Sequence, residues 1–268
     1  MTPPTLSFGE GPAIVVVGGA LRWAEDYTKL GQALAALGWH ACLLERRGRS
    51  GGSSPRRPGD GIEEEVADLA DACNEVGAVA VLGHSFGGLV CLEAVARGRV
   101  NAPVVVYEPG VSVGGSLPAT WVEGYLDRLA SGRRHAAFAH FVKNSTGSPA
   151  IARKLPEWYL SAVLRIALRR TWHRMDPLLE ASADEHLIVA ACDDRVHAYG
   201  AITQPVLALG GTNSPPALVQ IPFDALAAAI PNVTTRVLTG LDHFAPDEKD
   251  PACIAAEVDR FLRELELS

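Results

Sequence analysis

The sequence contains few cysteines, and they form no recognisable pair or cluster. The five are odd in number, widely separated and mostly set within apolar strand or helix patterns: Cys42, Cys73, Cys91, Cys192 and Cys253. Disulfide frameworks use even numbers of cysteines, and zinc sites use closely spaced ones, so this spacing argues against both. The pattern predicts reduced core thiols in a cytoplasmic protein, with no metal and no cofactor.

Long apolar runs, basic blocks and a leader pattern are also missing. No apolar run is long enough to span a bilayer, and the first residues, MTPPTLSFGEGP, lack a basic region followed by an apolar one. We therefore expect no membrane partner and no export signal. Beyond Arg46 to Arg57 there is no basic block, and the net charge is −7, which disfavours a nucleic-acid partner. The sequence leaves open whether the chain forms a homodimer.

Apolar residues make up 48% of the 268 residues, enough to bury a large core. Short β-branched runs alternate along the chain with helical patterns, which is typical of an α/β fold with a mostly parallel sheet. The predicted strands are Ala13 to Val17, Ala41 to Leu44, Ala78 to Leu82, Pro103 to Tyr107, Val206 to Leu209 and Val233 to Leu238. The predicted helices include Asp26 to Leu37, Gly59 to Val76, Phe223 to Ile230 and Ala252 to Leu265.

The strongest signal is the stretch from Ala78 to Gly98, where a buried-strand pattern meets GHSFG and then continues as a helix. In a GxSxG turn the serine sits on a strained corner, and side chains at the flanking glycines would collide with neighbouring backbone. Ser85 is therefore the candidate nucleophile. The amide of Phe86, at the start of the helix, can help to bind an oxyanion. The alternative is a glycine-rich turn with an incidental serine.

These residues resemble the α/β-hydrolase superfamily, in the compact form whose first strand ends in Gly-Gly and whose sheet is interrupted by a helical cap. The resemblance covers nearly the whole chain. It implies a mostly parallel twisted sheet of six or seven strands flanked by helices. The core would comprise residues 1–110 and 202–268, and the cap would comprise residues 111–201. Because only about a dozen residues precede Ala13, the first strands of the family are expected to be truncated here.

The resemblance also implies two further site residues. Ala20 follows Gly18-Gly19 at the end of the first predicted strand, where the family has its second oxyanion N–H; the alternative is a plain strand-to-helix turn. His243 follows the last predicted strand, where this fold carries its general base; the alternative is a surface loop histidine. The histidines in or near the cap are expected at polar surface: His135, His140, His173, His186 and His197.

The position of the third catalytic residue, the carboxylate that orients the histidine, departs from the common family pattern. The loop after the penultimate strand usually holds Asp or Glu, but here it reads GGTNSPP, and Asn213 cannot carry the charge. A known variant of the family has its acid at the end of the preceding strand, which in this chain is Glu108. The alternatives are that the site has no acid or that another residue takes this role, and the further candidates are Asp193, Asp194 and Asp242. The side chain of Asp242, adjacent to His243 in sequence, is expected to point away.

Two segments favour structural roles over chemistry. The loop from Glu45 to Gly51, ERRGRSG, matches the family's loop after the second predicted strand. Its arginines could face a substrate carboxylate, but a solvated loop or structural ion pairs are favoured. The cap carries many aromatic residues, which either line an apolar pocket or pack the cap onto the core.

Three functions fit these patterns. The first is a serine hydrolase that cleaves a small to medium apolar ester, thioester or lactone through an acyl-enzyme on Ser85. The second is an acyltransferase or cyclase that uses the same nucleophile in a biosynthetic pathway. The third is a ligand-binding protein that keeps the fold without turnover, which the absent carboxylate after the penultimate strand would favour. An apolar carbonyl compound is the expected partner.

Overall fold

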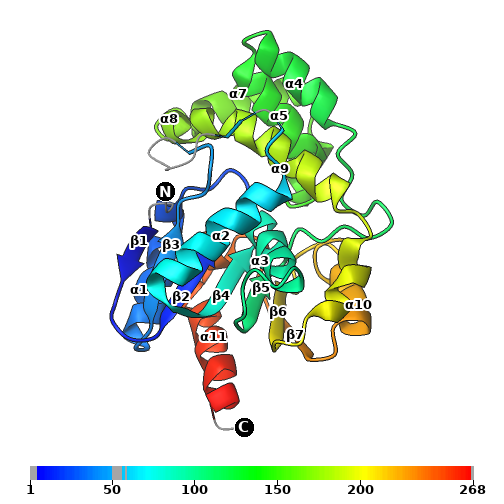
Figure 1. The fold of residues 1–268 in the computed structure, drawn as a ribbon. Helices are drawn as coiled ribbons and strands as arrows, with labels where there is room; N and C mark the ends of the chain where they lie inside the picture. The colour runs from blue at the N-terminus through cyan, green and yellow to red at the C-terminus, as the bar shows by residue number, and fades with distance from the viewer. Residues whose placement is uncertain (1–4, 50–55, 58, 267–268) are drawn as a thin grey trace.

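The protein forms one seven-stranded sheet in the computed structural model, which describes residues 5–49, 56–57 and 59–266 (Figure 1). In spatial order the strands are β1 (Thr5–Phe8), β3 (His40–Leu44), β2 (Ala13–Val17), β4 (Ala78–His84), β5 (Val104–Tyr107), β6 (Val206–Gly211) and β7 (Val233–Leu238). Every neighbouring pair is parallel except β1 and β3. The predicted mostly parallel α/β sheet is confirmed.

Strand β1 is the element that the apolar pattern did not identify. It pairs antiparallel with β3, with Leu6 opposite Leu43 and Ser7 opposite Cys42, and it forms the edge of the sheet. The strand has only four residues and is partly exposed, so its sequence lacks the continuous apolar run of a buried strand. The edge of the sheet on this side is thus a single short strand.

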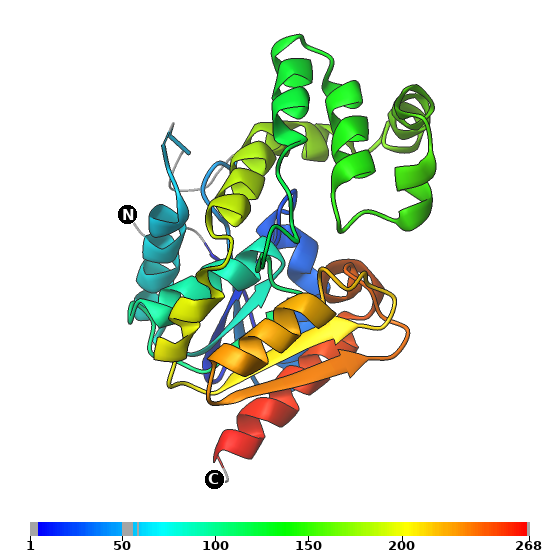
Figure 2. The same cartoon turned by 90° about the vertical axis from the view of Figure 1, so that its right-hand side faces the viewer.

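The central strands are buried on both faces, because helices cover both sides of the sheet (Figures 1 and 2). Alternate residues of one strand enter different cores: Val15 and Val17 pack on one face, and Ile14 and Val16 on the other. The first face is covered by α2 (Ile62–Val76), α3 (Phe86–Ala96) and α10 (Gln220–Ala229). The second is covered by α1 (Thr28–Ala36) and α11 (Pro251–Glu266). Each fully buried aliphatic side chain contributes about 1.5 to 3 kcal/mol of transfer free energy.

The chain between β5 and β6 forms a helical layer above the carboxyl ends of the strands (Figure 2). Its α-helices are α4 (Val122–Ala130), α5 (Arg134–Asn144), α6 (Ala150–Lys154), α7 (Glu157–Ala167), α8 (Trp172–Met175) and α9 (Leu179–Ala191). This layer has its own core, built around Trp121, Tyr125 and Phe138, and Leu21 of the sheet domain joins it. We call this layer the cap.

The last part of the insertion packs on the sheet domain. The 3-10 helix η3 (Arg195–Ala201) lies against α3 and α10, where the Tyr199 hydroxyl donates to Glu93 over 2.9 Å and the Arg195 guanidinium donates to Glu93 over 3.0 Å. Glu93 is fully buried and depends on these partners. Helix η3 falls within the predicted cap, residues 111–201, and its contacts are with helices of the sheet domain.

All five cysteines are free, and four of them are buried. Burial raises the pKa of the Cys73 thiol to about 12 and that of Cys192 to about 11, so these thiols stay protonated. Within the ranges that the structure describes, no helix combines the length and the apolarity needed to cross a bilayer.

Candidate active site

Ser85 stands on a sharp corner between β4 and α3. Its backbone has φ +54° and ψ −120°, a conformation that costs energy in a residue other than glycine. The flanking glycines make the corner sterically allowed: a Cβ on Gly87 would lie 2.1 Å from the Val17 carbonyl oxygen, and one on Gly83 would lie 2.4 Å from the Gly87 carbonyl oxygen. The Ser85 carbonyl accepts from the amides of Gly88 and Gly110, over 2.9 and 2.8 Å, which holds the turn.

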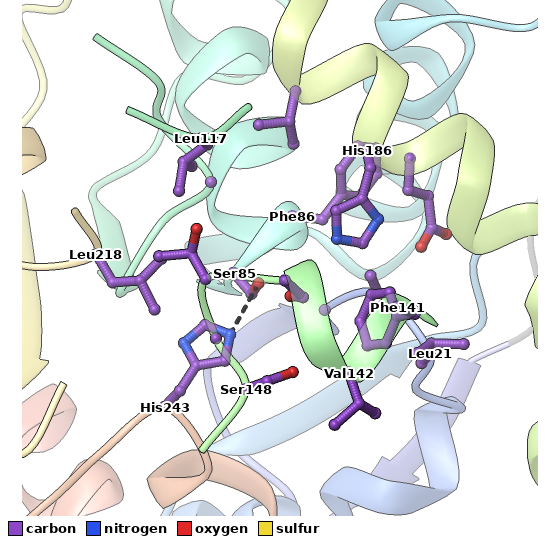
Figure 3. A pocket seen from close by; sticks show the side chains of 18 of the residues that line it. Leu21, Ser85, Phe86, Leu117, Phe141, Val142, Ser148, His186, Leu218 and His243 are labelled. Carbon is purple, nitrogen blue, oxygen red and sulfur yellow. Dashed lines mark hydrogen bonds between the residues drawn. The ribbon is translucent and has the colours of Figure 1, made fainter. Parts of the chain in front are cut away.

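The hydroxyl of Ser85 meets the ring of His243 across the carboxyl ends of the strands. The distance between Ser85 Oγ and His243 Nε2 is 3.1 Å, within hydrogen-bond reach (Figure 3). His243 lies in the loop between β7 and α11, 158 residues further along the chain. The topology thus joins the two residues that the sequence assigned as nucleophile and base.

Glu108 completes the chain of hydrogen bonds. Its Oε2 lies 2.8 Å from His243 Nδ1, and its Oε1 accepts from the Gly211 amide over 2.9 Å. Glu108 follows β5 and His243 follows β7, on either side of β6, and the carboxylate bridges the end of β6 through its bond to Gly211. The residue has φ +42° and is fully buried. A carboxylate in this place fixes the Nδ1–H tautomer of the ring, leaving Nε2 free to accept from the serine.

The other candidate acids do not contact the His243 ring. Asp193 and Asp194 accept from the amides of Gly115 and Gly114, at the base of the cap. Asp242 accepts from the Phe244 amide over 3.1 Å and pairs with Lys249, so its side chain points away as expected.

Asn213 and Tyr107 hold the histidine loop through its backbone. The Asn213 side-chain amide donates to the Gly240 carbonyl over 2.9 Å, and the Tyr107 hydroxyl donates to the Asp242 carbonyl over 2.8 Å. The position where the family usually has its acid therefore supports the loop without touching the imidazole.

The segment after β2 lies beside Ser85 and is held by a buried tyrosine. Ala20 and Phe86 both line the cavity that Ser85 enters, and Phe86 opens α3, whose first N–H groups have no partner within the helix. The Tyr27 hydroxyl accepts from the Gly19 amide over 2.9 Å and lies 2.6 Å from His84 Nδ1. Burial, followed by the charge of His243, lowers the pKa of His84 well below its usual value. His84 is thus a neutral wall of the site, and Tyr27 is a supporting residue that sequence reasoning missed.

A cavity of about 210 Å³ opens above Ser85, between the sheet domain and the cap (Figure 3). Its walls are mainly apolar, with Leu21, Leu117, Trp121, Phe138, Phe141, Val142, Met175, Val189 and Leu218 contributing side chains. One side is formed by the segment between α5 and α6, which includes Ser145 and Ser148. The aromatic residues of the cap thus serve both expected roles, since Trp121, Phe138 and Phe141 line the cavity and also pack the cap core.

His186 belongs to this cavity and not to the polar surface where the sequence placed it. It projects from α9 toward the space above Ser85, and its ring packs edge-on against Trp121 and Phe141 (Figure 3). Its Nδ1 lies 2.7 Å from the Ser182 carbonyl, which can only accept, so Nδ1 carries the proton. Burial lowers the pKa of His186, which leaves Nε2 as a neutral acceptor.

The arginines after β3 form structural ion pairs, which confirms one of the two favoured alternatives and excludes the solvated loop for the described residues. Arg46 and Arg49 are buried and bind Glu185 of α9, over 2.9 and 2.5 Å. Arg46 also donates to the Gly19 carbonyl over 2.8 Å, next to Ala20 in the chain. Burial raises the pKa of Glu185, but the two guanidinium groups outweigh it and lower the pKa to about 2. These ion pairs tie the cap to the sheet domain; Ser50 and Gly51 of the motif lie outside the described residues.

No group of three or more His, Cys, Asp or Glu side chains within the described ranges is arranged to hold a metal ion. The residues around Ser85 offer a hydroxyl, an imidazole, a carboxylate and backbone amides in a small apolar cavity.

Residues 14–256 match the profile of the family described as "Alpha/beta hydrolase family". No curated protein matches the sequence. Among solved structures, the chain is similar to an alpha/beta hydrolase from Sphaerobacter thermophilus DSM 20745, at 28% identity and a TM-score of 0.80. That match covers 97% of this chain and 96% of the other.

Two more distant structures resemble the chain in fold. A thermophilic esterase from Thermogutta terrifontis is 19% identical, with a TM-score of 0.72 and coverage of 98% of this chain and 93% of the esterase. A bromoperoxidase from Bacillus anthracis is 17% identical, with a TM-score of 0.68 and coverage of 96% and 94%. The same fold thus supports different reactions, and the reaction of this chain must be argued from its own site.

Proposed function

This chain belongs to the alpha/beta hydrolase family, and from that premise we propose that it is a serine hydrolase that cleaves a small to medium apolar ester, thioester or lactone. The observation that carries the proposal is the hydrogen-bonded series from Ser85 Oγ to His243 Nε2, and from His243 Nδ1 to Glu108, over 3.1 and 2.8 Å. Nucleophile, base and orienting acid need this order of contacts.

The proposed reaction has two steps. In the first, His243 Nε2 takes the hydroxyl proton as Ser85 Oγ attacks the carbonyl carbon, and the amides of Ala20 and Phe86 bind the oxyanion. The leaving alcohol or thiol then receives the proton from His243. In the second step, His243 deprotonates a water molecule, which attacks the acyl-enzyme, and His243 then returns the proton to Ser85 Oγ as the acid is released. Glu108 stays ionised throughout and stabilises the imidazolium.

The cavity limits the size of the substrate. A volume of about 210 Å³ lies below the usual range of about 300 to 1,000 Å³ for sites that hold drug-sized ligands. Its mainly apolar walls favour a short hydrocarbon acyl or alkyl group. The hypothesis of a non-catalytic ligand-binding protein rested on the absent carboxylate after the penultimate strand. The carboxylate of Glu108 at His243 Nδ1 argues against it.

The test is the hydrolysis of p-nitrophenyl acetate and p-nitrophenyl butyrate by the wild type and by Ser85→Ala. We expect kcat to fall at least about 10⁴-fold. Ser148→Ala is the matched control, because it removes another hydroxyl from the wall of the same cavity, and it should change kcat by less than about threefold. Undiminished turnover by Ser85→Ala would refute the proposal. Product analysis with added alcohols and amines distinguishes hydrolysis from acyl transfer.

A further inference from the structure

The outer end of the cap exposes large apolar side chains that nothing in the described structure covers. Helices α6 and α7 lie at the outer side of the cap (Figure 2). Ile151 of α6 is 76% exposed, and Trp158 and Ile166 of α7 are 75% and 77% exposed. These are the highest exposures among the large hydrophobic residues of the described chain. Isolated exposed apolar residues are ordinary, but several on one short segment mark an interaction surface.

Helix α7 is apolar on both of its sides. Leu160 is buried, and Leu164 packs against the cap core. The opposite side presents Trp158, Tyr159, Val163 and Ile166 to solvent. Tyr159, Val163 and Ile166 follow a spacing of four and three residues, which places them along one side of a helix. We call this side, together with Ile151, the apolar face of the cap.

The same segment carries more basic than acidic side chains in an acidic protein, although its basic residues do not form one block. Residues 150–170 contain five basic side chains, Arg153, Lys154, Arg165, Arg169 and Arg170, and one acidic side chain, whereas the whole chain has a net charge of −7. The acidic residue, Glu157, is bound to Arg128 over 2.8 Å and to His140 over 2.9 Å, on the cap side of the helix. Lys154, Arg165, Arg169 and Arg170 are exposed. The apolar face is therefore bordered by positive charge.

We propose that the apolar face of the cap docks on the surface of a membrane that contains anionic lipids. Tryptophan and aliphatic side chains with arginine and lysine at the margin are the composition of a helix that lies in the lipid interface. Basic side chains near an anionic lipid surface are attracted to it, and each adds to the binding. A second copy of the chain, docked on the same face about a two-fold axis, would bring the basic margins of both copies together. Charge complementarity thus favours an anionic lipid surface over self-association.

Docking would bring the lipid close to the cavity. The segment that includes Ser145 and Ser148 lines the cavity and leads directly into α6. An added Cβ on Gly147, in this segment, would lie 3.1 Å from His243 Cδ2. The wall of the site and the proposed contact surface are therefore a few residues apart. The sequence suggested no membrane partner because no run could span a bilayer, a criterion that does not bear on a helix lying on the surface.

The experiment is co-sedimentation of the full chain with vesicles made of equal parts of phosphatidylcholine and phosphatidylglycerol, or of phosphatidylcholine alone. We expect binding to the anionic vesicles only, and at least about tenfold weaker binding in about 0.5 M salt. Two double variants test the face: Trp158→Ser with Ile166→Ser, and Arg165→Glu with Arg169→Glu. Each should weaken binding at least about tenfold.

The matched control combines one apolar and one charge substitution elsewhere on the surface, Leu126→Ser with Arg99→Glu. Leu126 is 40% exposed and Arg99 is exposed, so the control alters the same kinds of side chain, and it should bind as the wild type does. All variants should hydrolyse a soluble p-nitrophenyl ester at the wild-type rate, which shows that they are folded and separates this proposal from the proposed function.

Three results would overturn the proposal. The first is no binding of the wild type to anionic vesicles. The second is equal loss of binding in the control. The third is a dimer without lipid that Trp158→Ser with Ile166→Ser converts to monomer, because the face would then be an interface between copies.

Discussion

Replacing Glu108 by glutamine tests the least expected residue of the site, because it keeps the shape of the side chain and removes its charge. Glu108 Oε1 accepts from the Gly211 amide, and Oε2 lies 2.8 Å from His243 Nδ1. A glutamine has one accepting oxygen and one donating NH₂ group. If its oxygen stays on the Gly211 amide, its NH₂ faces Nδ1, and the imidazole must carry its proton on Nε2.

That tautomer cannot accept the proton of Ser85. The opposite orientation of the glutamine restores the bond to Nδ1–H but sets NH₂ against the Gly211 amide, which costs about 1 to 3 kcal/mol for an unsatisfied buried donor. Both orientations also lose the negative charge that stabilises the imidazolium. In a serine triad the equivalent change lowers kcat about 10⁴-fold, or about 5 kcal/mol of activation free energy. We expect a loss of that size.

The assay is kcat for p-nitrophenyl butyrate, with the circular dichroism spectrum and the thermal midpoint recorded for each variant. The matched control is Asp242→Asn, which makes the same chemical change at the carboxylate next to His243 in sequence. Asp242 binds the Phe244 amide and Lys249, so its loss should cost less than about tenfold. A folded Glu108→Gln enzyme with less than a tenfold loss, or an equal loss in Asp242→Asn, would refute the assignment.

Two further predictions concern stability. Gly87→Ala should lower the free energy of unfolding by more than about 4 kcal/mol, since its Cβ would lie 2.1 Å from the Val17 carbonyl oxygen. Gly61→Ala, the control, should have a small effect. Denaturant unfolding of both variants tests this, and a stable Gly87→Ala variant would contradict the steric argument. Glu185, with a pKa lowered from 4.5 to about 2, stabilises the fold above pH 4.5 and loses this contribution as pH falls toward 2. The difference in unfolding free energy between the wild type and Glu185→Gln should therefore shrink by about 3 kcal/mol across that range, and a constant difference would contradict it.

The fold was predictable because its central strands have a recognisable sequence pattern. Buried parallel strands are apolar on both faces, so runs such as Ala13 to Val17 and Val206 to Leu209 stand out from the helices between them. Strand β1 lacked this signal because it is a partly exposed edge strand. The packing of η3 on the sheet domain could not be predicted for a different reason, since the contacts of η3 with Glu93 join residues about 100 positions apart.

The site was predictable to the extent that its residues sit in fixed places of the topology. Ser85 has a local motif, and Glu108 could be chosen because parallel strands bring their carboxyl ends to one edge. His186 and Tyr27 had no such marker. A cap histidine with no motif is indistinguishable in sequence from a surface histidine, and only the packing of α9 turns this one toward the cavity.

The buried ion pairs were predictable in kind but not in partner. The sequence has three arginines in the loop after β3, and it cannot show that Glu185, in a distant helix, binds Arg46 and Arg49. Nor can it show that these contacts hold the cap over the site. Such pairings arise from tertiary packing and leave no periodicity in the chain.

The most direct measurement of the central claim is covalent labelling with a fluorophosphonate, located by mass spectrometry of the digested protein. An activated serine should react rapidly, with a single adduct on Ser85, and labelling should be abolished in Ser85→Ala and slowed at least about 10³-fold in His243→Ala. An inert Ser85 in a folded protein, or an adduct on another residue that accounts for ester turnover, would contradict the account.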